Sequence, residues 1–300
     1  IVSYVAEHSR VDFVAKLASN WVRLRHQPAA QRNVALVLAN YPNRDGRLGN
    51  GVGLDTPAGT INIMHAMREA GYAVAGIPPD GNALIDILMR GPTNAAVAAR
   101  ELREWLPLAA YEKTYATLPQ TLRDEVEARW GPPQDDPFFL SDRQALAVPA
   151  CRFGRVVVGI QPARGYNIDP TSSYHDPDLV PPHGYFAFYI WLREVVAAHA
   201  IAHIGKHGNL EWLPGKALAL SEACYPEAVL GPIPHIYPFI VNDPGEGTQA
   251  KRRAQAIIID HLTPPLTRAE SYGPLAELER LVDEYYEAAG VDPRRLKLSQ

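Results

Sequence analysis

The run Ala200-Ile-Ala-His203-Ile-Gly-Lys-His207-Gly-Asn-Leu-Glu211-Trp-Leu-Pro-Gly215-Lys216 joins a short apolar stretch to a loop rich in glycine and polar side chains. Imidazole and carboxylate groups recur at every fourth residue, a spacing that would stack them on one face of a helix. Gly205, Gly208 and Pro214 disfavour an uninterrupted helix. The run therefore indicates a buried strand that ends in a loop. In an open α/β sheet, ligands bind beyond the carboxyl ends of the strands.

Apolar runs and helical patterns alternate along the rest of the chain. Residues 34–39 and 155–160 are short apolar runs typical of buried strands, whereas residues 3–25 and 185–199 carry helical periodicity. This alternation predicts an α/β fold, with parallel-type sheets, flanking helices and long Gly/Pro-rich loops at the strand ends.

The length of 300 residues suggests about two domains, and the proline-rich segment 131–137 is the best candidate for a hinge. We expect a first subdomain over 1–135, made of a helix and an α/β unit with the Gly-rich loop 40–57. A second α/β subdomain over 136–300 would carry the histidine and glutamate loop. Because the chain begins without Met, we expect both to belong to a much larger protein.

The composition argues against several classes of protein. A content of 47% hydrophobic and 21% charged residues is ordinary for a globular domain. The net charge of −4 gives no reason to expect a nucleic acid or an anionic membrane as a partner. No apolar run approaches the ~20 residues that a membrane span needs. Cys151 and Cys224 match neither a metal-binding pair nor a disulfide framework, so a reducing, cytoplasmic location is expected.

Four polar loops, each after a predicted strand, form the candidate site. The first, 40–57, contains Asn43 and Arg44, and its glycines permit close approach of the backbone to a ligand. A large surface Ω-loop would explain the same composition equally well. The fourth, 242–253, combines a helix N-terminus with a basic run that would hold carboxylates. A well-capped helix with a solvated basic face is the strong alternative for this fourth loop.

The second loop, 161–184, combines two histidines and three aspartates with a proline-stiffened backbone. This composition favours a metal or a polar substrate, although carboxylates in turns commonly cap backbone N–H groups. The third loop is the 203–216 run itself. Two histidines and a glutamate at a strand exit favour metal binding or acid–base chemistry over a purely structural role. The run is not the zincin motif, because no Glu follows His203.

A nucleotide-binding P-loop is missing from the sequence. Gly215-Lys216 resembles its end, but Leu210 occupies the place of the first glycine and Ala217 that of Ser or Thr. If ATP is involved, another polypeptide binds it.

Taken together, the four loops resemble the large-subunit family of tetrapyrrole metal chelatases, which comprises CobN-type cobaltochelatase subunits and magnesium chelatase H subunits. The matching blocks lie at 40–57, 174–184, 203–216 and 237–253, and they occur in the family's order. The second block reads Tyr174-His-Asp-Pro-Asp-Leu-Val-Pro-Pro-His-Gly184. The chain is more similar to the cobalt branch, because Lys206 stands where Met is expected in magnesium subunits.

The resemblance implies the catalytic, tetrapyrrole-binding subunit of an ATP-dependent cobaltochelatase, a ligase that forms nitrogen–metal bonds. This enzyme would insert Co²⁺ into hydrogenobyrinic acid a,c-diamide on the aerobic route to cobalamin. Partner subunits of the AAA+ ATPase and integrin types would bind and hydrolyse ATP, which this chain would not bind. The alternatives are a magnesium chelatase H subunit acting on protoporphyrin IX, a metal-dependent hydrolase, and a non-catalytic tetrapyrrole-binding module.

Within this interpretation, the polar residues of the four loops receive three expected roles. The metal ligands would be His203, His207, Glu211, His175, Asp176 and His183. The catalytic residues would be Glu211, which accepts the pyrrolic protons, with His203 and His207. The ring-binding residues would be Asn43, Arg44, Arg164, Tyr166, Asn167, Tyr174, Asn242, Lys251 and Arg252. Imidazole ligands suit cobalt better than magnesium, which prefers oxygen.

Overall fold

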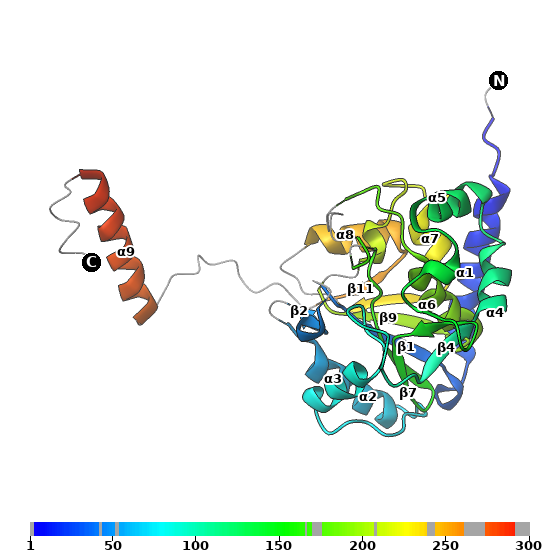
Figure 1. Cartoon of the computed structure of the whole chain (residues 1–300), viewed down its shortest axis with the longest axis horizontal. Coiled ribbons are helices and arrows are strands. Elements are labelled where there is room, and N and C mark those ends of the chain that lie inside the picture. The colour runs from blue at the N-terminus through cyan, green and yellow to red at the C-terminus, as the bar shows by residue number, and fades with distance from the viewer. Residues whose placement is uncertain are drawn as a thin grey trace. The chain divides into compact units, whose positions relative to one another are not determined.

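Strands and helices alternate along the chain (Figure 1). The computed structural model describes residues 3–41, 44–51, 54–165, 167–169, 176–206, 209–238, 244–260 and 274–291. The strands are β1 Val34–Leu38, β2 Asn50–Gly51, β3 Leu54–Asp55, β4 Glu104–Pro107, β5 Phe139–Leu140, β6 Ala145–Val148, β7 Ala150–Phe153, β8 Val156–Ile160, β9 Ala200–Ile204, β10 His235–Pro238 and β11 Ile257–Ile259. The helices are α1 His8–His26, α2 Thr56–Glu69, α3 Gly81–Arg90, α4 Leu108–Tyr115, α5 Gln120–Trp130, α6 His183–Glu194, α7 Tyr225–Leu230, α8 Pro244–Arg253 and α9 Pro274–Val291. Short 3₁₀ helices are η1 Ala29–Gln31, η2 Asp45–Arg47, η3 Pro133–Asp135 and η4 Leu210–Trp212.

The central sheet has six strands in the order β11-β10-β9-β1-β8-β7. The strands from β11 to β8 run parallel, and the edge strand β7 pairs antiparallel with β8. All five residues of β1 and of β9 are buried. Strands that are buried on both faces read as continuous apolar runs, which is why the sequence revealed them. The expected α/β fold with a mostly parallel sheet is confirmed.

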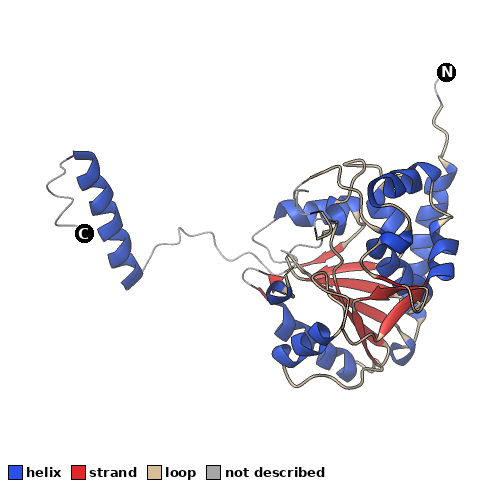
Figure 2. Ribbon diagram, viewed as in Figure 1, coloured by secondary structure: helices blue, strands red, loops and turns tan. Residues whose placement is uncertain are grey.

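Helices cover both faces of this sheet (Figure 2). Side chains alternate between the faces of a strand, so Ala35 and Val37 of β1 pack in the core that contains α6. Val34, Leu36 and Leu38 pack on the other face, with residues of α2 and α3. In α6, every residue from His183 to Leu192 is buried. A helix that is buried on all sides packs against hydrophobic neighbours around its whole circumference.

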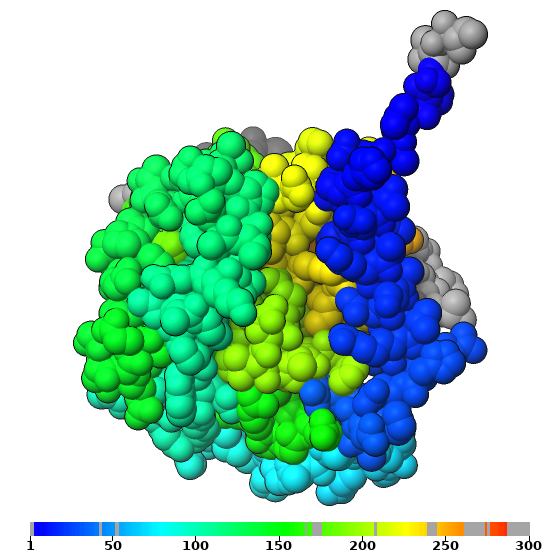
Figure 3. All heavy atoms as spheres, turned by 90° about the vertical axis from the view of Figure 1, so that its right-hand side faces the viewer, coloured from blue at the N-terminus to red at the C-terminus, as the bar shows by residue number. Residues whose placement is uncertain are grey.

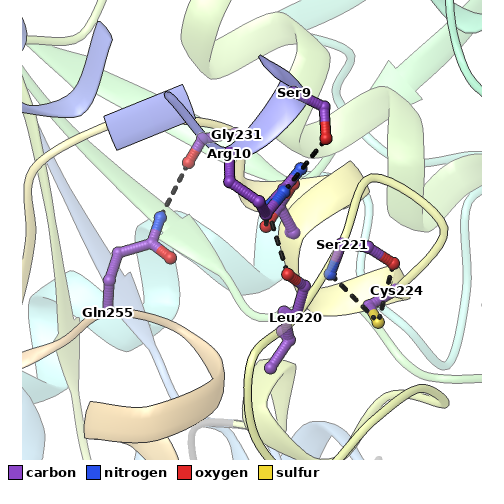
Figure 4. A network of polar contacts seen from close by, with 8 residues as sticks. Ser9, Arg10, Leu220, Ser221, Cys224, Gly231 and Gln255 are labelled. Carbon is purple, nitrogen blue, oxygen red and sulfur yellow. Dashed lines mark hydrogen bonds and ion pairs between the residues drawn. The ribbon is translucent and has the colours of Figure 1, made fainter. Parts of the chain in front are cut away.

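The first helix, α1, is fixed to the rest of the chain by polar contacts. The Arg10 guanidinium donates to both carboxylate oxygens of Glu227 in α7, at 2.6 and 2.7 Å, and to the Leu220 carbonyl at 3.2 Å (Figure 4). The Asn20 amide donates to the Pro232 carbonyl at 2.6 Å. Figure 3 shows the blue atoms of α1 beside the yellow segment that contains α7. No residue of α1 is fully buried, and these bonds add to the contacts of its half-buried apolar face, which includes Leu17 and Trp21.

The structure divides differently from the expected boundary at 135/136. Residues 1–261 form one compact unit, because β1 lies between β8 and β9 in the same sheet. Residues 262–300 form a second unit, of which the helix α9 is described. The expected strand at 72–75 is reduced to an isolated bridge at Val74. Among the described residues, no helix is long and apolar enough to cross a membrane.

Gly159 of β8 and Gly59 of α2 provide a matched test of this packing. A Cβ atom on Gly159 would lie 2.7–2.8 Å from the buried ring of Phe188 in α6. We expect Gly159→Ala to lower the free energy of unfolding by about 1–3 kcal/mol, because the ring must shift. A Cβ on Gly59 would meet no atom within 4 Å, so Gly59→Ala should stabilise the helix by about 0.5–1 kcal/mol. Urea denaturation of both variants measures this, and two equal effects would contradict the packing.

Candidate active site

The carboxyl ends of β1, β8, β9 and β10 meet at one edge of the sheet, because these strands run parallel. The side chains at this edge pack closely and leave no room between them for a bound ligand. The residues that pack there are Val37, Ala39, Gln161, His203, Ile204, Gly205 and Tyr237. Ligand pockets usually have volumes of about 300–1,000 Å³, so a large ring does not fit among these side chains. The packing nevertheless places His203 at the edge where ligands bind in α/β folds.

His203 belongs to a buried chain of hydrogen bonds, which we call the histidine chain: Gln161, Tyr189, His203 and His235. The Tyr189 hydroxyl of α6 lies 2.9 Å from His203 Nε2 and 2.9 Å from Gln161 Oε1. His203 Nδ1 lies 2.7 Å from His235 Nε2, and His235 Nδ1 lies 2.8 Å from the Ala254 carbonyl oxygen. All four side chains are at most 2% exposed. Both ring nitrogens of His203 therefore have protein partners.

Burial keeps both imidazoles of this chain neutral. It lowers the pKa of His203 well below 6.5, and the neighbouring His235 lowers the pKa further. Burial also lowers the pKa of His235 to about 4, against a smaller opposing effect of the Ala254 carbonyl. A neutral imidazole has one nitrogen with a hydrogen and one with a lone pair. The hydrogen bonds of the histidine chain therefore all point one way, and the Ala254 carbonyl at its end decides which way.

Glu211 lies in η4 and its side chain is fully buried. Burial raises the pKa of the Tyr189 hydroxyl, and the charge of Glu211 raises it further. Glu211 is thus close enough to Tyr189 to act on it electrostatically. The carboxylate is therefore within electrostatic range of one member of the histidine chain, Tyr189.

Arg253, the last residue of α8, holds the loop that carries Glu211. Its guanidinium donates to four backbone carbonyl oxygens. The acceptors are those of Glu211 at 2.6 Å, Leu213 at 2.8 Å, Lys216 at 3.0 Å and Gly215 at 3.1 Å. Lys251 and Arg252, the two expected ring-binding residues beside it, are exposed.

His183 lies at the first residue of α6, apart from the histidine chain in its contacts. Its Nδ1 lies 2.6 Å from the Tyr111 hydroxyl, and its Nε2 lies 2.9 Å from the Gly131 carbonyl. Burial lowers its pKa. Its ring also packs edge-on against Tyr111 and Tyr115. With both nitrogens engaged in the core, His183 supports α6 and offers no nitrogen to a metal in this conformation.

The remaining described candidates lie in or near the second loop, apart from the exposed Arg44. The Arg164 guanidinium donates to the Asp176 carbonyl at 2.7 Å, and the Asn167 amide donates to the Asn94 carbonyl at 3.3 Å. The Asp176 carboxylate accepts from the Asp178 N–H at 2.9 Å, which is an Asx turn. These contacts shape the loop and leave the expected substrate contacts untested.

Six expected residues lie outside the described part of the chain: Asn43, Tyr166, Tyr174, His175, His207 and Asn242. Among the residues that are described, no group of three or more His, Cys, Asp or Glu side chains is arranged to hold a metal ion. Of the expected metal set, His203 and Glu211 are both buried, with Glu211 in electrostatic range of Tyr189, the partner of His203, whereas His183 contacts Tyr111 and Gly131.

A wider cleft of about 690 Å³ lies between the second and third loops. Asp176, Asp178, Leu179 and Val180 line one part, and Pro214 and Gly215 line another, with Glu125, Ala128, Arg129, Ala223 and Tyr225. The volume falls in the range of pockets that take drug-sized ligands. Two of the four polar loops therefore meet at a cleft of suitable size for a large substrate.

Sequence reasoning missed several residues of the site, chiefly Asn40, Tyr189, His235 and Arg253. Asn40 follows β1 directly and is 2% exposed, and neither atom of its amide has a hydrogen-bond partner in the described part of the chain. A buried polar group without a partner is costly, so Asn40 is a candidate substrate contact. Tyr189 and His235 gave no signal, because a sequence does not show which helix and strand lie beside His203.

The chain is similar in sequence to proteins of known function along its whole length. The family model described as CobN/Magnesium Chelatase matches residues 1–300. The chain is 67% identical over 298 residues to the aerobic cobaltochelatase subunit CobN of Sinorhizobium sp, covering 99% of this chain and 23% of that protein. It is 59% identical over 297 residues to the same subunit of Pseudomonas aeruginosa, covering 98% and 24%. The chain thus spans about a quarter of the length of these relatives.

A solved structure supports the same similarity. The catalytic subunit of cobaltochelatase from Mycobacterium tuberculosis matches with a TM-score of 0.79 and 45% sequence identity. The match covers 99% of this chain and 25% of that chain.

Arg253 and Arg252 provide a test of how the Glu211 loop is held. Arg253→Ala removes four hydrogen bonds to carbonyl oxygens, so we expect a loss of at least about 2 kcal/mol in the free energy of unfolding. Arg252→Ala, an exposed neighbour, should change stability by less than about 0.5 kcal/mol. Urea denaturation measures the difference, and limited proteolysis should cut residues 211–216 faster only in the first variant. Equal behaviour of the two variants would contradict the role of Arg253.

The neutral histidines predict how stability depends on pH. The pKa values of His183, His203 and His235 are lower in the folded chain than their usual value of 6.5. Below about pH 6.5, the unfolded chain therefore binds protons that the folded chain does not. We expect the unfolding free energy to fall from pH 7 to pH 5, by at most about 1.4 kcal/mol per pH unit for each imidazole. Burial raises the pKa of Asp136, which acts in the opposite direction. A constant or rising free energy would show that the imidazoles are not neutral.

Proposed function

Because this chain belongs to the CobN/magnesium chelatase family, we propose that it forms part of the active site of an aerobic cobaltochelatase. This enzyme inserts Co²⁺ into hydrogenobyrinic acid a,c-diamide in the cytoplasm. The proposal is supported most by the burial of Glu211 within electrostatic range of Tyr189, whose hydroxyl is hydrogen-bonded to His203 at the end of β9. The high identity to two proteins named as aerobic cobaltochelatase subunits favours cobalt as the metal.

Metal insertion requires a base, because the ring's pyrrolic nitrogens must lose their hydrogens as the metal enters. We assign this role to the Glu211 carboxylate. His203 is a weaker base here, because burial disfavours its protonated form. We assign His203, through Tyr189, to organising the surroundings of the base. General acid–base catalysis of this kind contributes about 10²–10⁴-fold to a rate.

The arriving Co²⁺ must exchange water for protein ligands. Imidazole and carboxylate are suitable ligands for cobalt, and we propose His207 and His175 for this task, with Glu211 and Asp176. His203 would join them only if Tyr189 left its Nε2 atom, and His183 only if it left Tyr111 or Gly131. The metal is a substrate in this proposal, held briefly on its way to the ring.

The ring itself would occupy the cleft of about 690 Å³ between the second and third loops. Because Glu211 is fully buried and does not line this cleft, the η4 segment would have to move for the carboxylate to reach the ring. Its carboxylate and amide side chains would contact the polar residues around the cleft and the strand ends. The proposed contacts are Asn40, Asn43, Arg44, Arg164, Tyr166, Asn167, Tyr174, Asn242, Lys251 and Arg252. ATP would be bound by separate AAA+ and integrin-type subunits, because the sequence has no P-loop.

Glu211→Gln in the full-length protein, assayed with its ATPase partners, tests the base. Glutamine keeps the size of the side chain and cannot accept a proton. We expect the rate of Co²⁺ insertion to fall about 100-fold or more, with ring affinity changed less than about threefold. Glu222→Gln replaces an exposed carboxylate and should leave the rate unchanged.

The same assay decides the metal and the ring. The corrinoid and protoporphyrin IX are each offered with Co²⁺ and with Mg²⁺. Insertion of Mg²⁺ into protoporphyrin alone would overturn the cobalt assignment, and full activity of Glu211→Gln would overturn the base. Ring binding without any insertion would identify a non-catalytic module, and turnover without partners a hydrolase-like enzyme.

A further inference from the structure

His235 lies on β10, next to β9, with both ring nitrogens committed to hydrogen bonds. Strand pairing sets His235 opposite Ile201, so that it lies on the same face of the sheet as His203. The two rings meet edge to face, with centroids 4.7 Å apart and planes at 84°. His235 is fully buried. Its contacts therefore come from the protein alone and are set by the fold.

The partners of His235 determine where its hydrogen lies. The Ala254 carbonyl oxygen can only accept, so His235 Nδ1 must carry the hydrogen of the 2.8 Å bond. Because His235 is neutral, its Nε2 has a lone pair. The 2.7 Å bond to His203 Nδ1 then requires the hydrogen to be on His203. His203 is also neutral, which leaves the lone pair on its Nε2.

The lone pair on His203 Nε2 in turn orients Tyr189. The Tyr189 hydroxyl has one hydrogen and two neighbours at 2.9 Å, His203 Nε2 and Gln161 Oε1. A bare Nε2 draws this hydrogen to His203. The Gln161 amide, whose nitrogen lies 3.0 Å from the Tyr185 hydroxyl, then turns over, so that its N–H meets the Tyr189 oxygen and its carbonyl accepts from Tyr185. In the other tautomer of His203, Nε2 would carry the hydrogen and Tyr189 would donate to Gln161. The tautomer of His235 thus sets the tautomer of His203, which in turn sets the direction of the Tyr189 hydroxyl.

We propose that His235 is a positioning residue, which fixes the tautomer of His203 and through it the direction of the Tyr189 hydroxyl. The effect on turnover rests on the proposed function, because Tyr189 lies within the electrostatic reach of Glu211. The effect on the tautomer does not depend on that function. Partners that fix the tautomer of a metal-bound imidazole are worth about 10–100-fold in activity, and we expect a loss of the same order where the imidazole orients Tyr189.

Two substitutions separate this role from a merely structural one. In His235→Gln, the side-chain amide reaches the position of Nε2 and keeps an acceptor for His203 Nδ1. In His235→Asn, the amide reaches only the position of Nδ1 and keeps the donor to the Ala254 carbonyl. His235→Gln thus preserves the hydrogen bond to His203, on which the proposal depends. His235→Asn preserves the hydrogen bond to the Ala254 carbonyl, on which a structural role would depend.

Kinetics of the full-length protein with its partner subunits give one readout. We expect His235→Gln to keep kcat within about fivefold and His235→Asn to lower it about 10–100-fold, with KM for the ring within about twofold in both. In a His203→Gln background, His235→Asn should have no further effect, because the two residues act as a unit. An equal loss in both variants, a larger loss in His235→Gln, or an undiminished effect in the double variant would overturn the proposal.

A spectroscopic readout separates this proposal from the proposed function. Solid-state ¹⁵N spectra of the full-length protein, labelled only in histidine, distinguish protonated from bare imidazole nitrogens. The His203 signals are those lost in His203→Gln. We expect a bare Nε2 on His203 in the parent and in His235→Gln, and a loss of that state in His235→Asn. An Nε2–H tautomer in the parent would overturn the proposal even if cobalt insertion were observed. A bare Nε2 would support it even if insertion were not.

Discussion

The parallel pairing of β9 with β1 on one side and β10 on the other is the constraint on which the site depends. This pairing brings the carboxyl ends of four strands to one edge, and it sets His203 and His235 side by side on the face covered by α6. Parallel strands with helices on both faces are buried on both sides. Polar groups at these strand ends are therefore shielded from water, and each hydrogen bond between them is strengthened and fixes the orientation of its side chains.

Two kinds of support hold the acid–base groups in place. The histidine chain is built from regular elements, with Tyr189 on α6, His203 on β9 and His235 on β10. Glu211 lies instead on a loop, and Arg253 compensates by binding four of that loop's carbonyls. Groups on helices and strands are held more accurately than groups on loops. The four hydrogen bonds from Arg253 of α8 therefore hold the loop that carries the Glu211 carboxylate more rigidly than a loop alone would.

The sequence was informative where burial alone decides the structure. The apolar runs that became β1, β8 and β9 were recognisable, and so was the exit of His203 from its strand. The strand β4 was missed, because its four residues mix buried and exposed positions without a clear period. The placing of β1 between β8 and β9 was also not visible, since strand order is a property of the tertiary fold.

The side-chain partners were the hardest part to predict. His183 and His203 both look like metal ligands in the sequence, yet His183 turns toward Tyr111 at the start of α6. In the basic run Lys251-Arg252-Arg253, only the position on the helix decides that Arg253 points inward. Motif similarity supplied the family, whereas the roles of Tyr189 and His235 came from three-dimensional contacts that no spacing encodes.

The central claim is that Glu211 and the histidine chain face the ring from the carboxyl edge of the sheet. A structure of the full-length protein with the corrinoid bound would test this most directly. The account predicts the ring in the cleft lined by Asp176 and Gly215, with a pyrrolic nitrogen within hydrogen-bonding reach of the Glu211 carboxylate. A ring bound elsewhere, with Glu211 and Tyr189 still enclosed by protein, would contradict it.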